Sequence, residues 1–160
     1  MLSTYKGKMS SNSQEYETPD EIFIPLHKEF NFDMDLAASH INHKLSLYWT
    51  KEDNMFTKKI TGVNWLNPEF FTVGKFIKYV YSNLGDAIVV SLIMVKSNTN
   101  WWRDCVMKAK EVRFINQKVQ FKGTKQGLRF PMCVVIFQKH KGETRFTVFK
   151  QQNQSRDRAS

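Results

Sequence analysis

The feature that most constrains the fold of this chain is an apolar run, Ala87-Ile-Val-Val-Ser-Leu-Ile-Met-Val95. A strand with one exposed face alternates apolar and polar residues, whereas a strand covered on both faces is apolar almost throughout. The run is also too short to cross a bilayer, which takes close to 20 apolar residues. We therefore predict a strand at 87–95 that is buried on both faces of a sheet.

Strands and helices are predicted to alternate on either side of this run. Strand-like segments occur at 32–36, 63–66, 112–115, 119–121, 132–137 and 146–149, and helical apolar spacing occurs at 73–84 and, less regularly, at 99–110. A further helix is expected to begin at Thr18-Pro19-Asp20-Glu21, with Thr18 as its cap and Pro19 in the first turn. Residues 40–62 are expected to be largely loop. The pattern predicts an α/β sheet with helices on both faces, in a single compact domain.

The two ends of the chain differ from the middle in composition. Residues 1–14 and 151–160 are polar and poor in apolar side chains, so we expect a flexible N-terminal arm and a flexible C-terminal tail around a domain at 15–150. No apolar stretch approaches 18 residues and no leader pattern is present, so we expect an intracellular, cytoplasmic protein without a membrane partner.

The charge balance favours a polyanionic partner. The chain carries a formal net charge of +9 at pH 7, and its pI is about 9.6. Such a protein attracts nucleic acid through its phosphates.

Cys105 and Cys133 form no CxxC pair, and His40 and His43 have no further histidine or cysteine cluster nearby. Because zinc takes three or four protein ligands, we expect no metal site.

The tetrapeptide Asn67-Pro68-Glu69-Phe70 carries the most functional information. It follows the predicted strand 63–66, and it offers an amide oxygen, a backbone carbonyl held by proline and a flat ring. These groups can hold the amino group of a base turned out of the DNA stack and cover its face. The plainer interpretation is an ordinary Asn-Pro turn.

Asp35 occupies a similar position, because it ends the predicted strand 32–36. Ligands of open α/β sheets bind outside the carboxyl ends of the strands. We therefore expect Asp35 and Asn67 to share one edge of the sheet. Asp35 could instead be an acid that caps a neighbouring helix.

From about residue 15 to 137 the chain resembles the small phage-borne DNA N6-adenine methyltransferases often called Dam-like. The resemblance rests on the order and spacing of several short segments. They are Glu15-Tyr-Glu-Thr-Pro19, Phe32-Asp-Met-Asp-Leu-Ala-Ala38, Tyr48-Trp-Thr-Lys-Glu-Asp53, Trp65-Leu-Asn-Pro68, Ser97-Asn-Thr-Asn-Trp101, Val112-Arg-Phe-Ile115 and Phe130-Pro131.

The resemblance implies a Rossmann-like sheet, S-adenosylmethionine as methyl donor and adenine in double-stranded DNA as acceptor. It assigns Asn67, Pro68 and Phe70 to the target base. It assigns the donor to Thr18, Pro19, Asp35, Ala37 and Ala38, with Glu52 or Asp53 at its ribose or adenine. A phage-encoded member would act in the cytoplasm of the host cell.

The DNA-binding candidates are basic residues in a predicted loop region. The stretch 116–131 contains Lys118, Lys122, Lys125 and Arg129, which could reach phosphates beside the target site. The loop at 40–62 is a second candidate for contacts that select the target sequence.

Several positions depart from the family pattern. Glu69 stands where a second proline is usual, Phe70 replaces tyrosine, and Met94, Lys96, Asn98 and Gln117 also differ. Three interpretations therefore stay open. They are an adenine methyltransferase, a methyltransferase acting on cytosine N4, and a degenerate member that binds DNA or a host protein without catalysis.

Overall fold

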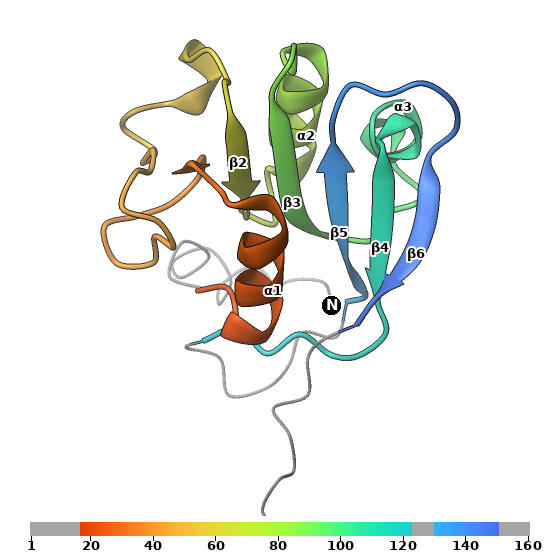
Figure 1. Cartoon of the computed structure of the whole chain (residues 1–160), viewed down its shortest axis with the longest axis horizontal. Helices are drawn as coiled ribbons and strands as arrows, with labels where there is room; N and C mark the ends of the chain where they lie inside the picture. Colours follow the sequence, from red (N-terminus) through yellow and green to blue (C-terminus); the bar gives the residue numbers. More distant parts are fainter. Residues whose placement is uncertain (1–16, 123–129, 151–160) are drawn as a thin grey trace, which may run out of the picture.

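A six-stranded sheet forms the centre of the protein in the computed structural model, which describes residues 17–122 and 130–150 (Figure 1). The strands follow the order β1-β2-β3-β5-β4-β6 across the sheet. All run in one direction except β5, which is antiparallel to both its neighbours. The strand bounds are β1 Met34–Asp35, β2 Val63–Leu66, β3 Ile88–Met94, β4 Glu111–Ile115, β5 Met132–Phe137 and β6 Arg145–Phe149.

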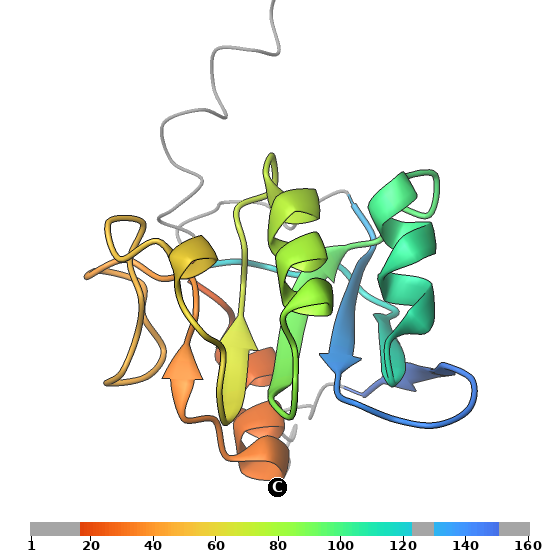
Figure 2. The same ribbon diagram turned by 90° about the horizontal axis from the view of Figure 1, so that it is seen from above.

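Helices cover both faces of the sheet, as the sequence predicts (Figures 1 and 2). Helix α1 (Asp20–Phe30) packs on one face, and α2 (Val73–Ser82) and α3 (Asn100–Asp104) pack on the other. Two 3₁₀ turns complete the set, η1 (Met55–Thr57) and η2 (Val106–Lys108). The arrangement is a mixed α/β domain compatible with a Rossmann-like methyltransferase fold.

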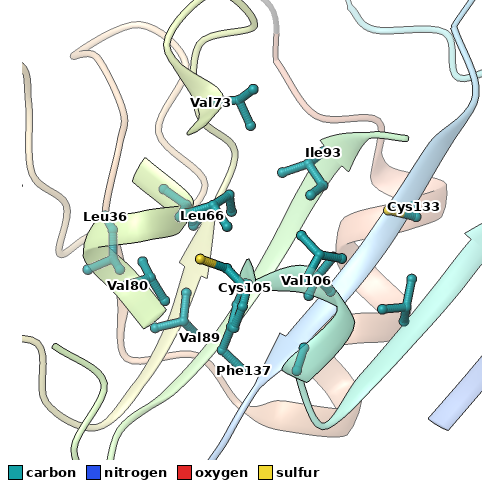
Figure 3. Packing of buried hydrophobic residues seen from close by; sticks show 14 of the residues in the cluster. Leu36, Leu66, Val73, Val80, Val89, Ile93, Cys105, Val106, Cys133 and Phe137 are labelled. Carbon is teal, nitrogen blue, oxygen red and sulfur yellow. The ribbon is translucent and has the colours of Figure 1, made fainter. Parts of the chain in front are cut away.

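The apolar run at 87–95 forms β3, and six of its seven strand residues are buried. Val89 and Ile93 face the α2 and α3 side, where they meet Leu66, Cys105 and Phe137 in the cluster of Figure 3. The alternate residues of the strand face α1. Both faces of β3 are therefore core, which confirms the prediction drawn from its unbroken hydrophobicity.

Two glycines allow close approaches that a side chain would block. A Cβ at Gly74 in α2 would lie 2.6 Å from Cδ1 of Trp101, so glycine lets α2 and α3 meet. Gly62 has φ +70°, and a Cβ there would lie 2.7 Å from Oδ2 of Asp33. That carboxylate accepts a hydrogen bond from the Val63 amide at 2.9 Å, where β2 begins.

The start of α1 differs from the prediction in one respect. The helix begins at Asp20 with Pro19 as its cap residue, and no side chain caps it. Thr18 is thus one position too early to act as the cap, because Pro19 already has the extended conformation of a cap residue, φ −61° and ψ 142°. The Thr18 hydroxyl has a different partner, described below.

The predicted strand at 119–121 is wrong. Val119 and Phe121 are buried and Gln120 is exposed, which matches the period of a strand. However, a strand needs a ladder partner, and both sides of β4 are already taken by β5 and β6. Val119 and Phe121 instead pack in the cluster beneath α1, and the segment ends at an isolated bridge between Lys122 and Glu17.

The predicted helix at 99–110 is divided into α3 and η2. The chain must leave the helix before residue 110, because the Lys110 amide already donates to the carbonyl of Ile136 in the sheet, at 3.0 Å. The strand expected at 32–36 is similarly shortened to Met34–Asp35, where it pairs with β2.

Candidate active site

A pocket of about 340 Å³ lies at the carboxyl ends of β1 and β2. Its size is within the range of small-molecule sites, and its position at these strand ends is where open α/β sheets bind ligands. The lining residues come from four parts of the chain. They are Leu36, Ala37, Ala38 and Asn42 after β1; Thr50, Lys51, Asn54, Met55 and Phe56 around η1; Asn67 to Phe70, Thr72, Lys75 and Phe76 at β2 and α2; and Phe121.

Asn67 reaches the pocket because β1 and β2 are parallel neighbours. Asp35, the last residue of β1, is paired with Trp65, and Asn67 directly follows Leu66 at the end of β2. Its side-chain nitrogen donates a hydrogen bond to the hydroxyl of Thr18, with 3.0 Å between Nδ2 and Oγ1. Nitrogen and oxygen lie on opposite sides of the amide, so this bond turns the carbonyl oxygen away from Thr18.

The rest of the tetrapeptide also forms pocket wall. Pro68 is buried, and Phe70 is partly buried with its ring set edge-on against Phe121, 5.8 Å between centroids. Glu69 is partly buried and lines the same pocket. The predicted base-binding residues are therefore brought together at one wall, and the segment 116–122 reaches them through Phe121.

Asp35 is at the predicted edge but does not line the pocket. It is only 3% exposed. One carboxylate oxygen accepts from the Lys44 amide at 3.1 Å, and the other accepts a longer bond from the Ala37 amide at 3.4 Å. Burial raises the pKa of this carboxyl to about 6, although the two backbone donors oppose the rise. Asp35 therefore holds the loop that presents Ala37 and Ala38 to the pocket.

Thr18 and Pro19 are both buried, and neither lines the pocket. The Thr18 hydroxyl accepts the hydrogen bond of the Asn67 amide, so Thr18 adjoins a pocket residue without lining the pocket itself. Its position next to the predicted base-binding residue could not be inferred from the spacing of 49 residues between them.

Glu52 and Asp53 are exposed in the turn before η1 and do not line the pocket. Oδ2 of Asp53 accepts from the Thr50 amide at 2.7 Å and from its hydroxyl at 3.0 Å, and the amide bond is the main reason that the pKa of Asp53 is lowered. The Asp53 carboxylate thus closes a turn from which Thr50 and Lys51 project to the pocket wall.

The basic candidates for DNA contact have separate environments. Lys118 is exposed. The Lys122 ammonium forms ion pairs with Glu17 at 3.1 Å and with Asp20 at 3.3 Å, which hold it against the start of α1. Lys125 and Arg129 lie outside the described residues, as do the predicted arm at 1–14 and tail at 151–160.

Other pocket residues escaped the sequence analysis. Lys51 and Lys75 bring positive charge to the wall, and the Lys75 ammonium lies 4.2 Å from the centre of the Phe56 ring. Phe76 follows on the first turns of α2 and packs on Phe56. The signal that could have found Lys75 and Phe76 is their place in the helix that directly follows the tetrapeptide.

His40 and His43 bind within their own loop. His40 is hydrogen-bonded to the Tyr48 hydroxyl at 2.7 Å, and His43 to the carbonyl of Leu45 at 2.9 Å. Within residues 17–122 and 130–150 no three His, Cys, Asp or Glu side chains are grouped as a metal site would need. Among the described helices, none has the length and hydrophobicity to span a membrane.

Comparison with known proteins agrees with the resemblance seen in the sequence. A family described as DNA N-6-adenine-methyltransferase (Dam) matches residues 7–159. The DNA N-6-adenine-methyltransferase of Haemophilus phage HP1 (strain HP1c1) is 30% identical over 148 residues, which cover 86% of this chain and 86% of that protein. The match extends far beyond the tetrapeptide and includes all six strands. The chain belongs to the DNA N-6-adenine-methyltransferase (Dam) family.

Proposed function

We propose that this protein transfers a methyl group from S-adenosylmethionine to the N6 amino group of adenine in DNA. The observation that carries the proposal is the wall formed by Asn67, Pro68 and Phe70 in a pocket at the carboxyl ends of β1 and β2. The name of the phage HP1 relative supports the same acceptor.

The pocket residues fit the proposed donor in size and chemistry. S-adenosylmethionine combines apolar and polar parts, and when bound it supplies a methyl group activated by a sulfonium. Leu36, Met55 and Phe76 give apolar surface, whereas Asn42, Asn54 and Thr50 give polar groups around the same cavity. Ala37 and Ala38 have small side chains, so a ligand can approach the backbone of the pocket wall after β1.

The wall at 67–70 suits the adenine amino group. The lone pair of this nitrogen is delocalised into the ring, so it is a poor nucleophile. The Asn67 side-chain oxygen and the Pro68 carbonyl would accept its two hydrogens, and this favours a pyramidal nitrogen whose lone pair faces the methyl group. Phe70 would stack on the base. Orientation and electrostatic stabilisation then promote transfer without a covalent intermediate.

The mouth of the pocket also offers contacts suited to DNA. Lys51 and Lys75 supply positive charge. Phe71 is 68% exposed between two pocket residues, Phe70 and Thr72. An exposed ring there can stack on a base, or take the space that an extruded base leaves in the helix, and so offset part of the unstacking cost of a few kcal/mol.

Titration calorimetry and a transfer assay test the proposal together. We expect S-adenosylmethionine to bind at micromolar strength and its labelled methyl group to appear in DNA. Asn67→Ala should lower the transfer rate at least a hundredfold, in line with losing one preorganised polar contact to the reacting group, while donor affinity stays within twofold. Absence of transfer to DNA of any sequence, with the variant unchanged, would reject the assignment.

Mass analysis of the modified nucleosides separates adenine from cytosine N4, since the same pair of acceptors could serve either amino group. The same analysis on oligonucleotides of varied sequence would give the target site. We expect N6-methyl-2′-deoxyadenosine as the product.

Glu69 favours a second candidate function, DNA binding without catalysis. Its place in the pocket wall puts a carboxylate where the family pattern has proline. This alternative predicts salt-sensitive DNA binding with no turnover. Comparison of the wild type with Glu69→Pro decides between them: activity only in the variant would mean that the natural chain is a binding protein.

A further inference from the structure

The side-chain amide of Asn67 is hydrogen-bonded to a buried residue, Thr18. Its nitrogen donates to the hydroxyl of Thr18 at 3.0 Å, and Thr18 is only 2% exposed. Thr18 is one of only four buried polar or charged residues in the described part of the chain. A buried hydroxyl is costly unless it is hydrogen-bonded, so this bond is expected to form whenever the domain is folded.

The torsion that turns a side-chain amide is soft. Rotation about the last bond of asparagine has broad minima, so the oxygen is not directed by the backbone alone. The proposed role of Asn67 requires that oxygen to face the acceptor amino group. A hydrogen bond donated by the amide nitrogen resists this rotation and also polarises the amide, which makes its oxygen a better acceptor.

Thr18 can act in this way because it is itself held on both sides. The preceding residue, Glu17, accepts the Lys122 amide on its carbonyl at 3.1 Å and binds Lys44 and Lys122 through its carboxylate. The following residue, Pro19, starts α1 and accepts the amides of Ile22 and Phe23 on its carbonyl, both at 3.1 Å.

A second contact keeps the two elements in register. The Phe23 ring of α1 meets the ring of Trp65 in β2 edge-on, with 5.5 Å between centroids. Trp65 precedes Asn67 by two residues, and Phe23 follows Thr18 by five. The start of α1 and the end of β2 therefore form one rigid unit, with the Thr18–Asn67 bond at the pocket end.

We propose that Thr18 is a positioning residue, which orients the Asn67 amide for the acceptor amino group. This inference rests on the proposed function of Asn67. It gives the buried hydroxyl of Thr18 a role other than helix capping, since no side chain caps α1.

The experiment compares Thr18→Val, which keeps the shape and removes the hydroxyl, with Thr18→Ser, which keeps the hydroxyl. We expect Thr18→Val to lower kcat about tenfold, the upper range for one lost neutral hydrogen bond, with the donor Kd unchanged within twofold. Thr18→Ser should stay within threefold of the wild type. The matched control is Thr147→Val on β6, at the far edge of the sheet, which removes a threonine hydrogen bond to Glu111 of β4 and should leave kcat unchanged.

A readout that needs no activity is the side-chain amide resonance of Asn67 in the free protein, assigned by its loss in Asn67→Ala. The bonded proton should shift and exchange faster with solvent in Thr18→Val, but not in Thr18→Ser. If Thr18→Val does not fold, Thr18→Ala against Thr18→Ser gives the same comparison.

The positioning role is overturned if Thr18→Val leaves kcat and the amide resonance unchanged. It is also overturned if donor affinity falls by the same factor as kcat, because Thr18 would then belong to the donor site. Failure of the proposed function gives a different pattern: the amide resonance responds to Thr18→Val, yet Asn67→Ala has no effect on methyl transfer or no transfer occurs at all.

Discussion

At the scale of single residues, a buried acid with a raised pKa holds the loop beside the pocket. Asp35 is held within the domain by two backbone donors, and burial raises its pKa from 3.8 to about 6. A carboxylate in that position is unfavourable near neutral pH, because ionisation in a poorly solvated place costs free energy. Its hydrogen bonds to the Ala37 and Lys44 amides shape the loop beside the pocket, and this role explains why an acid occupies the position despite the cost.

Asp35→Asn should change how stability depends on pH. A folded-state pKa raised above the unfolded value favours the folded state below pH 3.8, and this contribution is lost as pH rises through about 6. The free energy of unfolding of the wild type, relative to the variant, should thus fall by about 2 kcal/mol between pH 4 and pH 7. Urea unfolding at several pH values measures this. A difference independent of pH would contradict it.

Phe71→Ser should weaken binding to duplex DNA. The ring is 68% exposed beside the pocket, and stacking on a base contributes about 1–3 kcal/mol, which corresponds to roughly 5- to 150-fold in affinity. Fluorescence anisotropy with a labelled duplex measures the change. Phe146→Ser is the control, since that ring is also exposed but lies on β6, at the far edge of the sheet, and should leave DNA affinity unchanged.

Residue-level prediction from the sequence is easiest where a local pattern carries the information. Asn67, Pro68 and Phe70 could be predicted as candidates because the chemistry is contained in one tetrapeptide, and all three line the pocket. Lys75 and Phe76 were missed, since their approach to the pocket depends on how α2 packs. The contact between Thr18 and Asn67 joins residues on opposite sides of β1 in sequence, so only the fold reveals it.

At the scale of elements, an ion-pair cluster of Glu17, Asp20, Lys44 and Lys122 joins three segments around the site. Lys44 bridges Glu17 at 2.8 Å and Asp20 at 3.1 Å, and Lys122 pairs with the same two acids. The Lys44 side chain is only 7% exposed. The cluster links the start of α1 to the loop after β1 and to the segment that carries Phe121.

Glu17→Gln should make the protein less stable above pH 5. Its hydrogen bond with Lys44 is the largest reason that the pKa of Glu17 is lowered. A lowered pKa contributes stability above the unfolded value of 4.5, and this is lost as pH falls through the folded value. Because the Glu17 side chain is one-third exposed and screened by water, we expect a loss of only about 1 kcal/mol.

Thermal unfolding at pH 7 and pH 3.5 measures this, with a lower Tm for Glu17→Gln at pH 7 and a smaller difference at pH 3.5. Asp104→Asn is the control, because its partner Arg103 and Asp104 itself are both well exposed, and its Tm should match the wild type. An equal loss of stability at both pH values would show that Glu17 acts through packing rather than charge.

Elements could be predicted from periodicity where they pair or pack in the usual way. The strands β2 to β6 agree with the predictions within one residue or so. The segment 119–121 failed because its alternating burial comes from packing under α1, and periodicity cannot distinguish a buried extended segment from a paired strand. Partners in a sheet are set by the whole fold.

At the scale of the whole molecule, the sequence allowed the fold class and the edge of the sheet that carries the site to be predicted. Parallel strands end at the same edge, so two strand-end residues sufficed to locate it. The strand order could not be predicted from the sequence. β5 lies between β3 and β4, and no local feature of residues 132–137 indicates that position.

The net charge of +9 predicts a strong effect of salt on DNA binding. Each phosphate contact contributes a slope of about −0.9 in log affinity against log salt, so four contacts give roughly a hundredfold loss between 50 and 200 mM. Anisotropy titrations across this range measure the slope. Donor binding, measured by calorimetry in the same buffers, should vary far less. A flat DNA response would mean that phosphates contribute little.

The inserted position of β5 has a consequence for synthesis. β4 leaves the ribosome before β5, yet its two neighbours in the sheet, β5 and β6, both follow it in the chain. Until Met132–Phe137 has been translated, one edge of β3 has no hydrogen-bonded neighbour and β4 has no strand to pair with. The sheet therefore cannot close until residues 132–137, in the last fifth of these 160 residues, have been made, and a chain truncated before residue 132 would be prone to associate through the open edge of β3.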